Sequence, residues 1–214
     1  YDFTIQFGAE TDTLDSEGTI VETSDRIPSR ADIESVLPRF RGTIEQVPPV
    51  FSAVKVRGVR SYALARQNKE VALNARAVTI HTLELTSCAA DGRSACFSVC
   101  CSQGTYMRSL ARDIARAAGS CGCAEDIRRT AIGPFQVDDA VDGSHLDTLG
   151  GGAIISIAQA CSALPRITVS KSQQAALAVG KDIHASTTGS GSDDTVFAFD
   201  DSDRAVAILR RIDT

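Results

Sequence analysis

Strict alternation of apolar and polar residues is the feature that most constrains how this chain can fold. It occupies residues 1–7, which read Y-D-F-T-I-Q-F, and two further segments, 76–85 and 94–101, are β-rich. A period of two is typical of strands that bury one face. The two later segments, joined by a short loop at 89–92, are expected to form a hairpin. A β-sheet is therefore predicted at the centre of the fold.

Two segments carry helical periodicity instead. In residues 105–118 apolar side chains recur every three or four positions, and Gly119 ends the pattern. Residues 30–40 show the same spacing after Ser29, a residue type that caps helices well. Together with the strands, these segments predict an α/β (α+β) fold in which helices flank a mixed β-sheet.

The character of the chain changes after Leu164. Short β-prone runs at 167–169, 195–199 and 205–209 predict a small, mostly β unit. We therefore expect two domains, one formed by residues 1–162 and one by residues 163–214.

The net charge of −5, from 22 Lys and Arg against 27 Asp and Glu, does not indicate a general nucleic-acid binder. One region differs, because residues 55–76 hold a single acid and six basic residues: Lys55, Arg57, Arg60, Arg66, Lys69 and Arg76. Such a cluster suits RNA phosphates, although a solvated charged face would look the same. There is no apolar run of 18 residues and no signal peptide, so we expect a cytoplasmic protein without a membrane partner.

Seven cysteines are many for this length, but their number is odd and no secretory signal is visible, so a disulfide framework is not expected. Cys121 and Cys123 are separated by one residue, where zinc sites usually have two to four. We therefore expect no metal, and a cysteine-based metal or redox protein is the alternative that metal analysis would test. Cys96 and Cys100 alternate with other residues of a strand and are expected to be small core residues.

Four motifs occur in a fixed order along the chain. Residues 46–58 read Q-V-P-P-V-F-S-A-V-K-V-R-G, followed by Tyr62 and the pair Ala65-Arg66. Gly8 with T-D-T-L-D-S-E-G at 11–18, S-Q-G-T-Y-M-R at 102–108 and I-R-R-T at 127–130 complete the set. These motifs and their spacing closely resemble those of the TruB family of pseudouridine synthases, and the resemblance runs from Tyr1 to about Phe135.

The resemblance implies an enzyme that isomerises uridine 55 in the TΨC loop of tRNA to pseudouridine. The N-glycosidic bond is broken and the flipped base is reattached through carbon 5, with an aspartate nucleophile and without cofactor or metal. The implied partner is the TΨC stem-loop of tRNA, bound by a monomer. A non-catalytic RNA-binding or tRNA-chaperone protein of the same fold is the alternative.

Arg108 matches the arginine of the family that pairs with the catalytic aspartate. A guanidinium suits that role, because it holds a carboxylate through two hydrogen bonds and keeps it ionised. Spacing alone favours a surface charge on a helix, since Arg112 and Arg116 follow at intervals of four residues. The surrounding motif favours the catalytic role.

The resemblance also assigns the substrate-binding residues. Tyr1 matches the active-site tyrosine that stacks on the target base and takes part in proton transfer. Tyr106 and Ile127 match two residues that line the uracil pocket, where the family usually has Leu in place of Ile127. Lys55, in the first motif, is assigned to binding the substrate.

The nucleophile itself is missing from the motifs of this chain. The family carries it in an H-x-G-x-L-D-P motif upstream of the position of Tyr1, so we expect it upstream of this chain and expect these 214 residues alone to be inactive. Asp12 and Asp15 are assigned to turn structure. Arg108 is then expected to bind an anion, a water cluster or another acid.

Two further expectations concern the ends of the chain. Without the upstream segment, the strand at residues 1–7 is expected to lack a neighbour and to fray or associate at that edge. Residues 163–214 lie where many family members carry a PUA-like RNA-binding domain, so that identity and an RNA-binding role are assigned to them by position.

Overall fold

The structure, a computed structural model, describes residues 1–212 apart from 57, 68–71, 149, 151–153 and 186–193. The chain separates into two compact units, Tyr1–Arg129 and Thr130–Thr214. This division comes earlier than the expected boundary after residue 162, because the described residues between 130 and 162 contribute no strand to the large sheet of the first unit. The assignment of separate functions to two domains stays a prediction.

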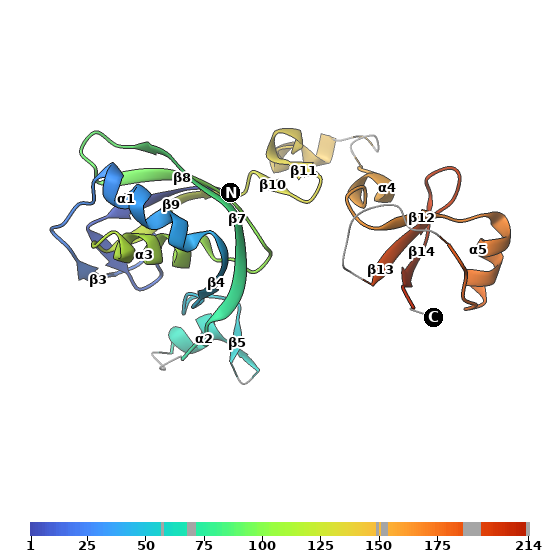
Figure 1. Cartoon of the computed structure of the whole chain (residues 1–214), viewed down its shortest axis with the longest axis horizontal. Coiled ribbons are helices and arrows are strands. Elements are labelled where there is room, and N and C mark those ends of the chain that lie inside the picture. The colour runs from blue at the N-terminus through green and yellow to red at the C-terminus, as the bar shows by residue number, and fades with distance from the viewer. Residues whose placement is uncertain (57, 68–71, 149, 151–153, 186–193, 213–214) are drawn as a thin grey trace. The chain divides into compact units, whose positions relative to one another are not determined.

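The first unit is built on a five-stranded sheet (Figure 1), whose described strands are β1 (Asp2–Phe7), β4 (Gly42–Gln46), β7 (Arg76–Cys88), β8 (Ser94–Cys101) and β9 (Gly122–Arg128). Their order is β4-β7-β8-β1-β9, and neighbouring strands pair antiparallel. The α/β class and the predicted hairpin of β7 and β8 are confirmed, while this sheet is antiparallel rather than mixed. The expectation that β1 lacks a neighbour is wrong, because β8 and β9 pair with it on either side.

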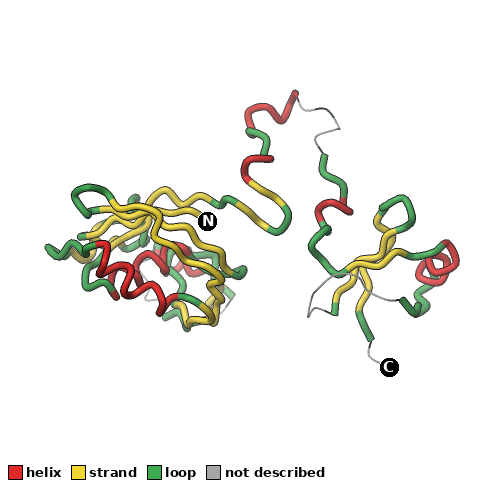
Figure 2. The backbone as a smooth tube through the Cα atoms, turned by 45° about the horizontal axis from the view of Figure 1, so that its top comes forward, coloured by secondary structure: helices red, strands yellow, loops and turns green. Residues whose placement is uncertain are grey.

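Two helices cover one face of this sheet (Figure 2): α1 (Arg30–Val36) and α3 (Met107–Ala117). Ser29 caps α1 as predicted, and its hydroxyl accepts a hydrogen bond from the Asp32 N–H. The predicted helix to residue 40 ends as an α-helix at Val36 and continues as a 3-10 turn, Leu37–Phe40. Pro38 explains the change, because it has no N–H for the α-helical ladder.

The core lies between the sheet and these helices. Phe3, Ile5 and Phe7 of β1 are all buried, which confirms the alternation read from the sequence. They pack with Leu110 and Ile114 of α3 in one apolar cluster. Burial of side chains of this size contributes about 1.5–3 kcal/mol each, so this face of β1 holds α3 against the sheet.

The alternation of β8 has the opposite phase to the one expected. Phe97 and Val99 face the core, and the Phe97 ring stacks on Phe3 with centroids 5.3 Å apart. Cys100 is exposed and Cys96 is half-buried, so their expected place in the core is wrong. A shift of one residue moves every side chain of a strand to the other face, and here the larger side chains occupy the core.

Two small hairpins project from the first unit. One joins β2 (Ala9–Thr11) to β3 (Ile20–Thr23), and the other joins β5 (Lys55–Val56) to β6 (Val59–Arg60), which leads into α2 (Ser61–Ala65). The turn between β2 and β3 reaches the free edge of β9, where the Ala124 N–H donates to the Leu14 carbonyl at 3.0 Å. This contact covers an edge that would otherwise expose unpaired backbone groups.

The second unit contains a three-stranded sheet whose strands are β12 (Arg166–Thr168), β13 (Thr195–Phe199) and β14 (Ala205–Arg210). These strands confirm the three β-prone runs of the sequence. The helix α5 (Lys171–Ala178), capped by Ser170, was not predicted. Shorter elements precede the sheet: β10 (Ala131–Ile132), β11 (Phe135–Gln136), 3-10 turns at Val137–Asp139 and Gly143–Thr148, and α4 (Ile157–Ala160).

None of the helices in the described residues combines the length and the apolar character that crossing a bilayer requires.

Candidate functional site

The first turn of α3 presents Arg108 to the turn between β2 and β3. Its Nη1 donates to the Thr13 carbonyl at 2.8 Å and to Asp15 Oδ2 at 3.1 Å, and its Nη2 donates to the Phe51 carbonyl at 2.9 Å. The guanidinium therefore touches two of the sequence motifs and has one charged partner and two neutral ones. About a quarter of the Arg108 side chain stays exposed.

Arg108 keeps some of its hydrogen-bonding capacity. An arginine has five N–H donors, and these contacts use both donors of Nη1 and one of Nη2. Within the part of the chain that the structure describes, the Nε donor and the second Nη2 donor have no acceptor. A further carboxylate or another anion can therefore be bound here through charge-assisted hydrogen bonds.

Asp15 holds the turn and the arginine together. Its Oδ1 accepts from the Thr13 hydroxyl at 2.6 Å and from the Glu17 N–H at 3.3 Å, as expected for a turn residue. Its Oδ2 accepts the hydrogen bond from Arg108, a role that was not predicted for Asp15 from the sequence. The expectation that Arg108 would meet another acid is met by this contact.

Leu14 lies between Thr13 and Asp15, the two residues that accept hydrogen bonds from Nη1 of Arg108. Its side chain is buried, and its backbone has a φ of 63°. A left-handed conformation costs a residue with a Cβ roughly 1–2 kcal/mol, so it persists only where the surroundings fix it. Here the Leu14 carbonyl is bound by β9, and the Thr13 carbonyl and Asp15 carboxylate on either side both reach Arg108. The local backbone strain thus accompanies a geometry that gives Arg108 two acceptors.

Tyr1 lies at the start of β1 and has an unexpected partner. Its phenol oxygen accepts a hydrogen bond from Nε of Arg129 at 2.8 Å, and the Arg129 guanidinium lies 5.1 Å from the centre of its ring. Arg129 is the second arginine of the I-R-R-T motif, and that motif was the signal that could have identified it. Together these contacts hold the phenol in one orientation.

Ile127 follows a bulge in β9. The register shifts between the pairs Asp2–Arg128 and Thr4–Glu125, and Asp126 at the shift has a φ of 51°. Bulges of this kind redirect the side chains that follow them. Ile127 is 41% exposed, so an apolar side chain faces outward beside the start of β1.

Tyr106 and Lys55 lie on other elements. Tyr106 is the N-cap of α3 and Lys55 is exposed on β5. Tyr106 and Arg108 thus share one end of α3, while Tyr1 and Ile127 share the adjoining ends of β1 and β9. In the described ranges, no hydrogen bond or ion pair joins Tyr106 or Arg108 to Tyr1 or Ile127. A single cleft that contains all four residues stays a prediction.

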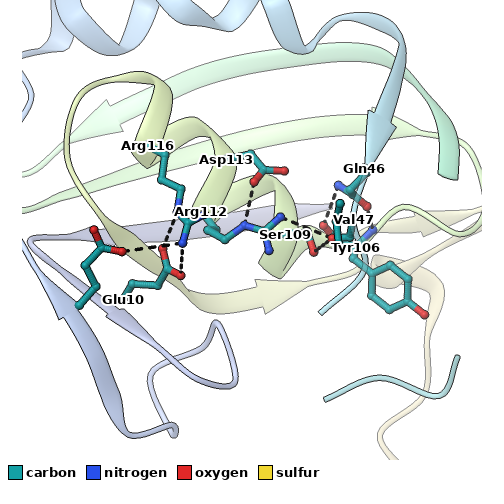
Figure 3. Close-up of polar contacts among 9 residues, drawn as sticks. Glu10, Gln46, Val47, Tyr106, Ser109, Arg112, Asp113 and Arg116 are labelled. Atoms are coloured by element: carbon teal, nitrogen blue, oxygen red, sulfur yellow. Dashed lines mark hydrogen bonds and ion pairs between the residues drawn. The ribbon is translucent and has the colours of Figure 1, made fainter. Parts of the chain in front are cut away.

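The far end of α3 carries a second arginine pair (Figure 3). Arg116 donates from Nε to Glu10 Oε2 at 2.9 Å and from Nη2 to Glu10 Oε1 at 2.7 Å. Glu10 is buried, whereas about half of the Arg116 side chain is exposed. A second carboxylate, that of Glu22, lies 3.8 Å from Arg116.

The cysteines form no site in the structure. All seven are free, and no group of three or more potential metal ligands occurs among the described residues. Burial raises the pKa of the Cys121 and Cys123 thiols, and nearby carboxylates, Glu22 for Cys121 and Glu125 for Cys123, raise it further. A raised pKa keeps a thiol protonated and unreactive, so these two cysteines act as packing residues.

The second unit contains a groove of about 570 Å³ lined by α5, β14 and residues 180–185. Apolar side chains such as Leu177 and Ile183 share it with the charged Lys181 and Arg210. None of the site residues expected from the sequence lies in it.

Comparisons with known proteins agree with the motifs. Residues 1–107 match the family model of TruB family pseudouridylate synthase (N terminal domain). The tRNA pseudouridine synthase B of Novosphingobium aromaticivorans is 49% identical over 156 residues, which cover 72% of this chain and 51% of that protein. The protein of the same name from Rhizobium etli is 38% identical over 195 residues, covering 86% of this chain and 63% of that protein.

The chain thus spans about half to two thirds of the length of these relatives. A chain of a crystal structure of a Cbf5-Nop10-Gar1 complex has the same fold, with a TM-score of 0.65 and 24% identity, covering 100% of this chain and 60% of that one. The match over half of its residues, together with the identity to these relatives, shows that this chain belongs to the TruB family of pseudouridylate synthases.

Proposed function

We propose that this protein is a tRNA pseudouridine synthase that isomerises uridine 55 in the TΨC loop of tRNA. The observation that carries the proposal is the family match over residues 1–107, which contains Tyr1 and Tyr106 and ends one residue before Arg108. The protein acts in the cytoplasm as a monomer and needs neither a metal nor a cofactor.

In this proposal Arg108 holds the nucleophilic aspartate. The nucleophile comes from the segment that the family places before the position of Tyr1, and the free Nε and Nη2 donors of Arg108 bind its carboxylate. A guanidinium that is hydrogen-bonded to a carboxylate favours its ionised form, which is the form that attacks. Asp15 fixes Arg108 from the opposite side and leaves those donors available.

The flipped uracil is held by the remaining predicted site residues. The Tyr1 ring stacks on the base, and Arg129 keeps the phenol in place for proton transfer at carbon 5. Tyr106 and the outward-facing Ile127 form the apolar walls of the pocket. Supporting this arrangement, Asp2 of β1 pairs with Arg128 of β9, so Tyr1 and Ile127 each come next to a residue of this pair.

Basic residues near β5, β6 and α2 bind the RNA backbone. Lys55, Arg60, Arg66 and Arg76 are exposed in the structure, while Arg57 and Lys69 of the same run lie outside the described residues. Contacts of this kind release counterions, so binding weakens as salt rises. The second unit, residues 163–214 in particular, is proposed to act as a PUA-like RNA-binding domain.

The experiment uses the complete gene product and a TΨC stem-loop RNA. Pseudouridine is measured by tritium release from uridine labelled at carbon 5, with a stem-loop that has cytidine at the target position as the control. Multiple turnover at the target uridine is expected. Tight, salt-dependent binding of the stem-loop without any turnover would overturn the catalytic proposal and favour an RNA-binding or tRNA-chaperone protein.

A further inference from the structure

Gln46, the last residue of β4, holds the backbone of a residue 60 positions later in the chain. Its Oε1 accepts from the Tyr106 N–H at 2.8 Å, and its Nε2 donates to the Tyr106 carbonyl at 3.2 Å (Figure 3). The Gln46 side chain is among the most buried of the polar ones, with 2% exposure. These two opposed bonds reproduce with a side chain the pairing that neighbouring antiparallel strands make with their backbones.

Tyr106 is the residue at which α3 begins. Its side chain makes no capping bond, and its carbonyl accepts the first helical hydrogen bond, from the Leu110 N–H at 3.0 Å. Gln46 therefore binds both backbone groups of the N-cap residue. Because peptide groups are planar and stiff, fixing this N–H and this carbonyl also fixes the direction in which the helix starts.

Arg108 follows Tyr106 by two residues, in the first turn of α3. Its guanidinium is held by Thr13, Asp15 and Phe51, but these contacts lie at the far end of a long side chain. The backbone from which this side chain extends begins two residues after the Tyr106 backbone that Gln46 holds. A displacement of about 1 Å in a catalytic group costs up to about 100-fold in rate, so the placement of this backbone matters for the reaction.

We infer that Gln46 is a positioning residue for the proposed reaction, which sets the start of α3 so that Tyr106 and Arg108 meet the flipped uridine and the nucleophile in the correct geometry. The inference rests on the proposed function. Gln46 touches neither the substrate nor Arg108 itself, and it acts through the Tyr106 backbone.

Ser109 offers a matched control. Its hydroxyl, also fully buried, donates to the Val47 carbonyl at 2.8 Å and so joins the same helix to the residue next to Gln46. Ser109→Ala weakens the packing of α3 against this segment but leaves both bonds to Tyr106 in place. This variant therefore distinguishes the effect of weaker packing of α3 from the effect of losing the two bonds that hold the Tyr106 backbone.

Two substitutions test the two-bond pairing itself. Gln46→Met keeps the length of the side chain and removes both hydrogen bonds. Gln46→Glu in its ionised form accepts from the Tyr106 N–H but repels the Tyr106 carbonyl. In its protonated form it has one O–H donor and one C=O acceptor, which is the pattern of the amide. Burial raises the pKa of the introduced acid, so the pairing is restored below that pKa and lost above it.

Activity is measured with the complete gene product on the TΨC stem-loop, from mildly acidic to mildly alkaline pH. Gln46→Met is expected to lower kcat on the order of 10- to 100-fold, with KM close to that of the wild type, and Ser109→Ala to leave kcat close to the wild type. The ratio of Gln46→Glu to wild-type kcat should rise as the pH falls, while that of Gln46→Met stays flat. A Gln46→Met kcat no lower than that of Ser109→Ala, or a flat ratio for Gln46→Glu, overturns the inference.

A second measurement does not depend on activity. Hydrogen exchange at the Tyr106 amide, followed by NMR, reports the bond to Gln46 directly. Faster exchange at Tyr106 in Gln46→Met, but not in Ser109→Ala, supports the positioning role even if the wild type isomerises no uridine, an outcome that would refute only the proposed function. Equal exchange in the wild type and Gln46→Met overturns the inference whatever the activity.

Discussion

Arg108 and Arg116 lie on the same helix, about two turns apart, and each binds a carboxylate from the β2–β3 hairpin. The two contacts differ in which N–H donors of the arginine they occupy. Arg116 places Nε and Nη2 on the two oxygens of Glu10. Arg108 donates from Nη1 to one oxygen of Asp15, and its other two bonds go to backbone carbonyls.

Under the proposed function, this difference separates a structural pair from the pair at the active site. The bidentate fork between Arg116 and Glu10 neutralises a buried carboxylate and occupies the Nε of the arginine. Arg108 keeps two N–H donors that have no acceptor among the described residues, and its one acidic partner also binds Thr13 and Glu17. An arginine whose Nε is free can take up a further carboxylate, whereas the Nε of Arg116 already binds Glu10 and holds that pair in the fold.

The largest effect is expected from Arg108→Ala. It should lower pseudouridine formation in the TΨC stem-loop on the order of 100- to 1000-fold, as expected for removal of a preorganised charge from an active site. Arg108→Lys should lose most of the activity as well, because Lys cannot bind the carboxylate of the proposed aspartate nucleophile through two hydrogen bonds. Arg116→Ala is the matched control and should retain activity per folded molecule. Equal losses for Arg108→Ala and Arg116→Ala would remove the distinction between the two arginines.

Asp15→Asn should have a smaller effect on the same assay, about tenfold in kcat. Asn keeps the acceptor oxygen that binds Thr13 and Glu17, so the turn stays intact, but the charge opposite Arg108 is lost. The two carbonyl contacts of Arg108 remain and limit the damage. If Asp15→Asn abolished binding of the stem-loop while kcat at saturation stayed unchanged, Asp15 would instead belong to the RNA-binding surface.

Glu10→Gln should change stability rather than activity. Gln accepts one of the two bonds from Arg116 and carries no charge, so the free energy of unfolding should fall by about 1–2 kcal/mol. That range already allows for solvent screening of the half-exposed Arg116. Urea denaturation measures the loss, and turnover per folded molecule should match the wild type. Normal stability with impaired turnover would contradict the structural role of this pair.

Glu22→Gln should have the smallest effect. Its carboxylate is exposed and lies 3.8 Å from Arg116, and exposed pairs of this kind contribute less than about 0.5 kcal/mol. The urea midpoint should match that of the wild type. A loss equal to that of Glu10→Gln would mean that Arg116 is held by both acids together.

Local patterns predicted three of the five strands of the large sheet and both helices that cover it, but not β4 or β9. The alternation at β1, the hairpin of β7 and β8, and the capping of α1 by Ser29 depend on neighbours in the sequence, and all three are confirmed. The phase of β8 depends on which face meets Phe3 from a distant strand, so Cys96 and Cys100 were assigned to the wrong side. The helix α5 lacks a strong apolar stripe, and its capping box of Ser170 and Gln173 was the one sequence signal that could have predicted it.

The candidate site shows the same limit. Tyr1, Tyr106, Arg108 and Ile127 were found through motifs, because motif matching needs only sequence order. The partners of these residues were not, since Asp15 reaches Arg108 through the left-handed conformation of Leu14, and no local preference predicts φ > 0 for leucine. From the sequence, Gln46 was known only as the first residue of a motif. Its bonds to Tyr106 show that it lies next to the start of α3.

The interior position of β1, between β8 and β9, also has a consequence for synthesis of the chain. Tyr1 pairs with Val99, 98 residues later, and β9 begins only at Gly122. At ribosomal speeds of about 5–20 residues per second, the apolar face of β1 waits roughly 5–20 s before its first partner strand emerges. A sheet closed by such distant pairs forms slowly. During that interval Phe3, Ile5 and Phe7 are the side chains that a nascent-chain chaperone would bind.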